Sequence, residues 1–425
     1  MAARAEHCDV VIVGTGAGGG IIAHKLAKAG LNVVSLEPPG AKLDFGIGPS
    51  TVWPADPHDS LFVHPLFADG MHGATTRPAD GFRHFQILKL NGLQNLWNGV
   101  SVRFSEVDFA GWPFGYDTLA DDYSAVEKLI TVCGTKEGIP ELPDGEFIPP
   151  KPLRPADKII VSAVNALNEP FSHAIPNRKA IITTPGLASS CISTGICTSG
   201  CPVGAVYKFS ARLLPEIAGL PNYELRTNAK VTRVLRDGTS ERVSGVEYID
   251  TETGERRTLS ARFVVLAAGA IETPRILFNS ADEADPAGLA NRHDRVGQGL
   301  QDNPKAVLST SLLRLWGKKR DYDIGYGDLL ILMSRGKLPD GSSFPFIGHA
   351  IHGLPDVPHY LSGFSGFPPQ VKTRLARIMF HSYVTLGLFC AGEARPENRV
   401  RPGTTTDSDG VPQVAVDFTT PPAAR

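Results

Sequence analysis

The sequence predicts an α/β protein with a parallel, Rossmann-like sheet and a second domain beside it. Two stretches predict the sheet: a strand–turn–helix–strand unit over residues 8–37, and a strand–turn–helix over 261–280. The length predicts the second domain, because 425 residues exceed the roughly 250 to 300 at which a single hydrophobic core usually stops growing.

The first unit opens the chain. "CDVVIVG" at 8–14 is a β-branched run that predicts a buried parallel strand. "GIIAHKLAKAG" at 20–30 has apolar residues at helical spacing and ends at Gly30, and "LNVVSLE" at 31–37 predicts a second strand. These residues form one βαβ unit.

The turn of this unit carries a glycine motif. Gly14, Gly16 and Gly19 have GxGxxG spacing, and their missing side chains let a pyrophosphate approach the positive end of the helix. Glu37 closes the second strand, where it can accept hydrogen bonds from an adenosine ribose. The alternative is a purely structural tight turn. Since strand, helix and terminal acid agree with the glycines, the unit predicts a dinucleotide site, without separating FAD from NAD.

The second unit, "ARFVVLAAGAIETPRILFNS", is a buried strand, a small-residue turn at Gly269 and Ala270, and a helix that begins near Pro274. By itself it is another α/β crossover. Its "GAIETPRIL" is similar to the second signature of the glucose-methanol-choline (GMC) oxidoreductases, FAD enzymes that oxidise alcohols. The position of the first βαβ unit at the N-terminus also resembles that family.

Further stretches resemble the family in the same order along the chain: "LWNGVSVRF", "NAKVTRVL", "RVGQGLQDNP" and "ARPENRV". The resemblance implies that FAD binds here. The implied cofactor-binding residues are Gly14, Gly16, Gly19, Glu37, Trp97, Asn98, Val231, Ala268 and Gly269.

The resemblance also implies a domain plan. A discontinuous FAD-binding domain is expected over 1–150 and 190–310, and an α+β substrate-binding domain over 151–189 and 311–425. Some relatives attach FAD covalently through a histidine where this chain has Leu96, so FAD is expected to bind without a covalent link.

Three of the six cysteines, Cys191, Cys197 and Cys201, lie within eleven residues. A disulfide would leave one cysteine of the group over, and a zinc site would need a fourth ligand, whereas three thiolates suit a 3Fe–4S cluster. The loop resembles that of the flavoprotein subunits of FAD-dependent glucose, fructose and sorbitol dehydrogenases, where such a cluster passes electrons on. Many family members without a cluster have a similar loop, so both interpretations stay open.

The catalytic residues are not identified by the sequence. The family uses a histidine, with a second His or Asn, in a C-terminal segment after "PENRV", and this sequence has no histidine beyond His381. We therefore expect the catalytic segment to be absent, through truncation, a split enzyme or a degenerate companion subunit. None of His349, His352, His359 and His381 is assigned as a base.

The expected function is oxidation of a CH–OH group of a sugar, polyol or related alcohol, with a non-catalytic FAD-binding companion as the alternative. The formal charge of −2 gives no reason to expect nucleic acid as a partner. No export signal or apolar run of 18 residues is visible, which indicates a cytoplasmic chain, carried to the periplasm if a small exported subunit binds it. A cytochrome, or a chain that supplies the C-terminal segment, is the other expected partner.

Overall fold

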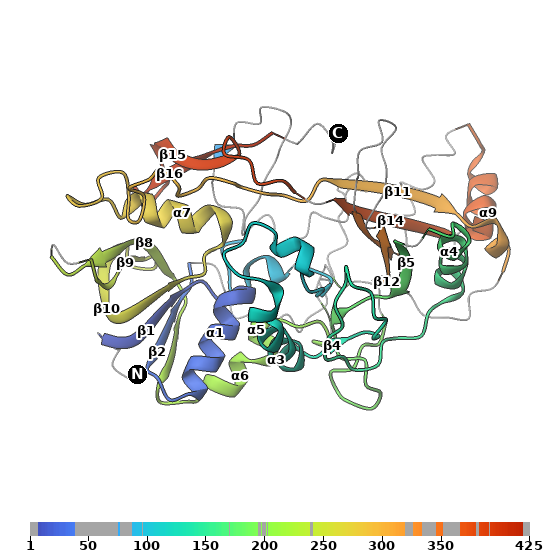
Figure 1. The fold of residues 1–425 in the computed structure, drawn as a ribbon, viewed down its shortest axis with the longest axis horizontal. Coiled ribbons are helices and arrows are strands. Elements are labelled where there is room, and N and C mark those ends of the chain that lie inside the picture. Colours follow the sequence, from blue (N-terminus) through green and yellow to red (C-terminus); the bar gives the residue numbers. More distant parts are fainter. Residues whose placement is uncertain are drawn as a thin grey trace.

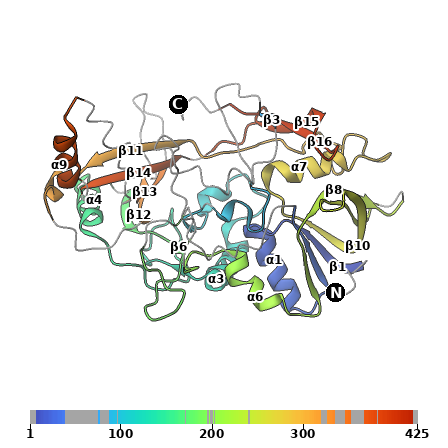
Figure 2. The same ribbon diagram turned by 180° about the vertical axis from the view of Figure 1, so that it is seen from behind.

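The computed structural model places two sheets at opposite ends of an elongated molecule (Figures 1 and 2). The predictions on Leu96, His352, His359 and His381 lie outside the described residues. The structure describes residues 7–38, 75–76, 87–95, 97–169, 171–193, 197, 201, 203–238, 241–318, 326–333, 346–351, 366–379, 382–390 and 392–419.

The first sheet has six strands and confirms the predicted parallel α/β architecture. β1 pairs in parallel with β2 and β10, β2 pairs in parallel with β7, and β8, β9 and β10 are antiparallel. In spatial order the strands are β7 (Tyr223–Arg226), β2 (Val33–Leu36), β1 (His7–Val13), β10 (Glu255–Leu266), β9 (Val243–Asp250) and β8 (Ala229–Arg236).

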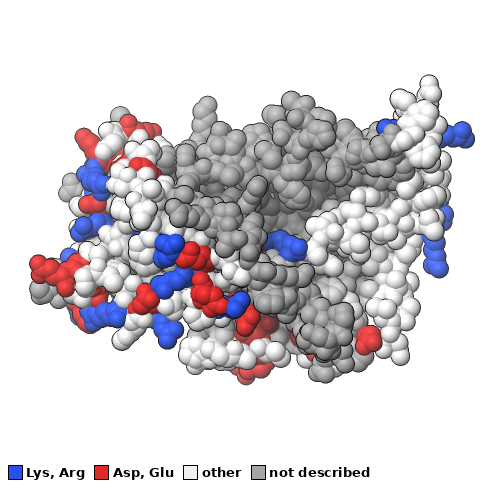
Figure 3. Space-filling view, turned by 90° about the horizontal axis from the view of Figure 1, so that it is seen from above, with Lys and Arg blue, Asp and Glu red and all other residues white. Residues whose placement is uncertain are grey.

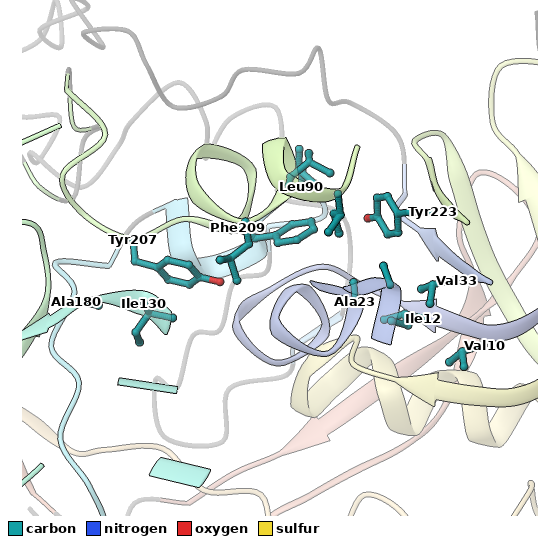
Figure 4. Close-up of a cluster of buried hydrophobic side chains, with 14 of the residues drawn as sticks. Val10, Ile12, Ala23, Val33, Leu90, Ile130, Ala180, Tyr207, Phe209 and Tyr223 are labelled. Carbon is teal, nitrogen blue, oxygen red and sulfur yellow. The ribbon is translucent and has the colours of Figure 1, made fainter. Parts of the chain in front are cut away.

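Helix α1 (Ala17–Lys28) covers one face of this sheet (Figure 1). The short helices α5 (Phe209–Arg212) and α6 (Leu214–Ile217) pack against α1. Phe209 and Tyr223 lie beside Ala23 of α1 and Ile12 of β1 (Figure 4). A Cβ at Gly20 would stand 2.6 Å from Cγ of Phe209, so a glycine lets this ring lie directly on the helix. Each fully buried large apolar side chain of this core stabilises the fold by roughly 1.5 to 3 kcal/mol.

The second sheet has five antiparallel strands. Apolar residues of one face, among them Leu329, Ala350 and Val384, pack on α4 (Pro155–Ala166), while Leu330 and Ile347 belong to a cluster on the other face. α9 (Pro369–Met379) lies at the same end of the molecule (Figures 1 and 2). The spatial order is β11 (Lys305–Ser311), β14 (Tyr383–Cys390), β13 (Phe346–Ile351), β12 (Tyr326–Met333) and β5 (Ser172–Pro176).

A hairpin of β15 (Arg399–Thr406) and β16 (Pro412–Asp417) lies along α7 (Gly269–Asn279) in both views (Figures 1 and 2). Phe278 of α7 packs with Val400 and other apolar residues of the hairpin. The hairpin therefore adjoins the six-stranded sheet, which differs from the expected assignment of 311–425 to the substrate-binding domain. The domain boundaries themselves stay a prediction.

The remaining described elements lie outside the two large sheets. Acidic and basic side chains alternate over the end that carries the six-stranded sheet (Figure 3), and no described helix is long and apolar enough to cross a membrane. The short elements are α3 (Ala120–Ile130), β3 (Thr75–Thr76), β4 (Val132–Cys133), β6 (Lys179–Ala180) and the 3₁₀ helices η1 (Gly92–Asn95), η2 (Glu106–Phe109), η3 (Tyr116–Thr118) and η5 (Leu313–Leu315).

Candidate active site

A cleft of about 520 Å³ lies where β1 and β2 end and α1 begins. The carboxyl ends of parallel strands are the usual place for a nucleotide in this architecture. Gly19 lies behind the lining, within α1, and Asn98 follows Trp97. The structure thus brings most of the expected cofactor-binding residues to one cleft, whose lining includes Gly14, Gly16, Glu37, Trp97, Val231, Ala268 and Gly269.

The three glycines of the motif have different surroundings. Gly14 has a φ of +91°, and a Cβ there would stand 2.7 Å from the carbonyl oxygen of Ala267. A Cβ at Gly19 would collide with the carbonyl oxygen of Gly14 and would stand 3.0 Å from Cβ of Ala267. A Cβ at Gly16 would meet only the carbonyl oxygen of Asn91, at 3.9 Å. Gly14 and Gly19 therefore permit the turn to pack on β10, while Gly16 leaves room in the cleft.

The N-terminus of α1 is open towards this cleft. Gly16 is the N-cap, so no side chain caps the helix, and its first turn has no acidic residue. The first backbone N–H groups of a helix lack partners inside the helix and bind anions well. Together with the space left at Gly16, they fit the pyrophosphate of a dinucleotide.

Glu37 is 3% exposed and lines the same cleft. The backbone N–H and the hydroxyl of Thr15 both donate to its Oε1, and within the described part of the chain Oε2 accepts no hydrogen bond. Burial raises the pKa of Glu37 to about 7, although the bonds from Thr15 lower it. A ribose hydroxyl that donates to Oε2 would favour the charged carboxylate, so this acid fits the adenosine end of a dinucleotide.

Asn91 lies in the loop before Trp97, and its side chain is hydrogen-bonded to α5. Its Oδ1 accepts from the backbone N–H of Ser210, and its Nδ2 donates to Oγ of Ser210, both at 2.8 Å. Asn91 is buried and has a φ of +73°. The carboxamide thus fastens the loop to α5. Sequence reasoning missed this contact, because the two residues are 119 positions apart.

A network of ion pairs joins β6 and the N-terminus of α4 to β12 of the five-stranded sheet. Nζ of Lys179 lies 3.0 Å from Oδ1 of Asp328, and Nη1 of Arg154 lies 2.8 Å from Oδ2. Burial alone would raise the pKa of Asp328, but the two cations hold it well below its usual range. The backbone of Lys179 also forms an isolated antiparallel β-bridge with Val100. Lys179 therefore holds the loop after Asn98 against the sheet. Sequence reasoning missed this network, although an acidic residue inside the apolar run "YGDLLILM" is a signal that could have indicated it.

The three clustered cysteines meet in one apolar cluster. The backbone N–H of Ser193 points to Sγ of Cys191 at 3.4 Å, and that of Ala205 points to Sγ of Cys201 at 3.2 Å; Cys197 packs beside them. Within the described residues, which leave out part of this loop, no group of three His, Cys, Asp or Glu side chains is arranged to hold a metal ion. The iron–sulfur cluster stays a prediction.

The sequence profile of the GMC oxidoreductases matches residues 178–305. Over 97% of this chain and 73% of the relative, the sequence is 28% identical to 6'''-hydroxyparomomycin C oxidase of Streptomyces lividus. It is 26% identical to the fructose dehydrogenase large subunit of Gluconobacter japonicus over 71% of this chain and 59% of that subunit. The middle of the chain therefore has the sequence profile of the GMC oxidoreductases, and most of its length is similar to the two relatives.

The same fold occurs in a solved structure. Pyridoxine 4-oxidase from "Mesorbium loti" superposes with a TM-score of 0.58 over 96% of this chain and 75% of that chain, at 17% identity. The profile match includes Val231, Ala268 and Gly269, and the cleft that they line also contains the N-terminal glycine turn of this chain. The cofactor of the family, FAD, therefore fits the donor groups and the space of this cleft.

Proposed function

We propose that this chain is an FAD-dependent oxidoreductase that oxidises a CH–OH group of a sugar, polyol or related alcohol. The observation that carries the proposal is the cleft in which the open N-terminus of α1, Gly16 and Glu37 meet. The names of the two relatives support the substrate class, since one is a 6'''-hydroxyparomomycin C oxidase and the other a fructose dehydrogenase large subunit.

The residues of the chain would divide the work along the cleft. The N–H groups at the start of α1 would hold the pyrophosphate, and Glu37 would accept hydrogen bonds from the ribose. Val231 would lie by the adenine, and Trp97 and Asn98 near the flavin ring. Bound FAD would accept the hydride of the alcohol, which carries both electrons of the oxidation. Removal of the hydroxyl proton stays unassigned within the described residues.

An electron relay through an iron–sulfur cluster is a finer proposal. It is supported by the shared position of Cys191, Cys197 and Cys201, by the N–H groups that point to two of their sulfur atoms, and by the similarity to the fructose dehydrogenase large subunit. Hydrogen bonds to sulfur are one way in which proteins tune such clusters. A cytochrome, reached in the periplasm with a small exported subunit, would be the next carrier. In a companion subunit, by contrast, FAD would bind and no alcohol would be oxidised.

The test is anaerobic purification of the chain, followed by an absorption spectrum, quantification of FAD, iron and sulfide, and addition of sugars and polyols. We expect FAD and bleaching of its absorbance by at least one sugar. About three irons per chain would support the relay, and FAD without iron would support an oxidase or dehydrogenase that has no cluster. FAD that no alcohol reduces would favour the companion.

A glycine pair makes this test specific to the cleft. Gly16→Ala places a methyl group where the pyrophosphate would lie, whereas a Cβ at Gly18 would meet nothing within 4 Å. We expect Gly16→Ala to weaken FAD binding at least about tenfold and Gly18→Ala to leave it nearly unchanged. Both apo proteins should unfold within about 1 kcal/mol of the wild type. Equal FAD affinity in all three proteins would contradict the assignment of the cleft.

A further inference from the structure

His349 lies on the face of the five-stranded sheet that is turned away from α4. Its neighbour Ala350 packs in the cluster with α4, and side chains alternate between the faces of a strand. Ile347, two residues earlier, packs on the opposite face in a cluster that also contains Val102. His349 therefore faces the side of the sheet that the loop after Trp97 covers.

The imidazole of His349 occupies a niche between two glycines on the neighbouring strands. Gly387 of β14 is its direct partner across the sheet, and a Cβ there would stand 3.3 Å from Nε2 of His349. Gly327 of β12 has a φ of +65°, and a Cβ there would stand 3.4 Å from Cδ2 of His349. The ring of Phe389 lies with its centroid 5.0 Å away. Backbone and ring thus fix the imidazole without a polar contact.

Asn98 borders the same niche. Its Nδ2 would stand 2.9 Å from the same Cβ position at Gly327, so the carboxamide and the imidazole are neighbours across this glycine. Oδ1 of Asn98 accepts from the N–H of Val100 at 3.4 Å, which leaves Nδ2 as the group directed elsewhere. Within the described residues Nδ2 donates no hydrogen bond.

His349 has hydrogen-bonding capacity that the described protein does not use. It is 9% exposed, yet neither ring nitrogen makes a hydrogen bond within the described part of the chain. Burial, with the charge of Lys179 nearby, lowers the pKa of His349 to about 4. The ring is therefore neutral near pH 7, with one nitrogen that accepts and one that donates a hydrogen bond.

We propose that His349 and Asn98 together bind a hydroxyl group of the alcohol substrate. The hydroxyl would donate a hydrogen bond to the unprotonated nitrogen of His349 and accept one from Nδ2 of Asn98. This arrangement gives partners to two side chains whose nitrogen atoms have unused hydrogen-bonding capacity within the described residues. The inference rests on the proposed function, because it uses the expected position of Asn98 near the flavin ring.

The test compares four FAD-loaded proteins: wild type, His349→Leu, His349→Gln and His173→Leu. His173 lies on β5 of the same sheet and is the matched control. D-fructose and D-glucitol are titrated anaerobically, and the half-saturating concentration is read from the flavin absorbance. We expect a rise of about tenfold in His349→Leu, the equivalent of one lost hydrogen bond. His349→Gln, which keeps a donor and an acceptor, should stay within about threefold of the wild type.

Asn98→Ala supplies the second readout. Because both groups would hold one hydroxyl, Asn98→Ala combined with His349→Leu should raise the half-saturating concentration less than the product of the single effects. FAD content is measured for each protein, and His349→Gln carries the comparison if His349→Leu loses FAD. An unchanged half-saturating concentration in His349→Leu, or an equal rise in His173→Leu, would overturn this inference alone. A wild type that binds no FAD, or whose FAD responds to neither sugar, would overturn the proposed function with it.

Discussion

The cofactor cleft contains the buried carboxylate of Glu37 and the five-stranded sheet the half-buried carboxylate of Asp328, and the two are stabilised in opposite ways. Glu37 has only the hydroxyl and N–H of Thr15 as described partners, so burial wins and its pKa rises to about 7. Asp328 lies between Lys179 and Arg154, so charge pairing wins and its pKa falls. Burial alone does not decide whether an interior acid is charged; its partners do.

The comparison also separates two ways of building a site. The pyrophosphate end of the cleft uses backbone groups and missing side chains from residues close in sequence, as Gly14, Gly16 and Gly19 show. The sheet face uses polar side chains that lie 149 residues apart, as Lys179 and Asp328 show. The first design leaves room for a ligand with many polar groups, and the second holds two parts of the chain in a fixed position.

The largest effect is expected at the charged network. Asp328→Asn leaves Lys179 and Arg154 buried without the carboxylate between them, which should cost about 3 to 5 kcal/mol of unfolding free energy. Chemical denaturation measures it. The control is Asp417→Asn, which removes an ion pair with Arg401 that is 44% exposed on both sides and should cost less than about 1 kcal/mol. Similar losses in the two variants would mean that Asp328 is not a buried anion.

Glu37 is expected to make the free energy of unfolding depend on pH, because burial raises its pKa, whereas ion pairing lowers that of Asp328. In the folded protein without FAD, Glu37 has a pKa of about 7, whereas its ordinary value is 4.5. Between these two pH values the folded protein keeps a proton that the unfolded chain releases. The contribution of this proton to the free energy of unfolding is therefore complete below pH 4.5 and is lost as the pH rises through 7. The loss approaches about 3 kcal/mol.

Glu37→Gln provides the measurement, because glutamine cannot titrate. The difference in unfolding free energy between wild type and variant should change with pH only between about 4.5 and 7. Saturating FAD should flatten this change, since ribose hydroxyls would stabilise the charged carboxylate. If the difference in unfolding free energy stays constant from pH 4.5 to 7, the pKa of Glu37 is not raised by burial.

The smallest of the three effects is steric. Gly19→Ala drives a methyl group into the carbonyl oxygen of Gly14, and relief requires a shift of the turn, for about 1 to 3 kcal/mol. Gly18→Ala, one residue earlier in the same helix, adds a methyl group in open space and should leave stability equal or slightly higher. Thermal unfolding of the apo proteins distinguishes the two. Equal stability would mean that the turn is not packed as closely as the structure indicates.

Much of the first sheet could be predicted, since its signals are local. The strand predicted over 8–14 is β1 (His7–Val13), and the strand predicted over 31–37 contains β2 (Val33–Leu36). The expected helix end near Gly30 is confirmed, because α1 ends at Lys28 and Gly30 has a φ of +87°. Hydrophobic periodicity and glycine positions suffice where partners are near in sequence.

The sequence by itself determined the βαβ unit and the glycine turn, because each depends on residues within a few turns of chain, and it determined the resemblance to GMC oxidoreductases, because each matching stretch is itself short and contiguous. Only the tertiary structure decided that the β15–β16 hairpin packs on α7, that Asp328 is charged between two cations, and that His349 stands beside Asn98 across Gly327. These contacts join segments far apart in sequence. A histidine in a strand becomes a candidate for substrate binding only when the sheet shows which face it occupies and what lies opposite.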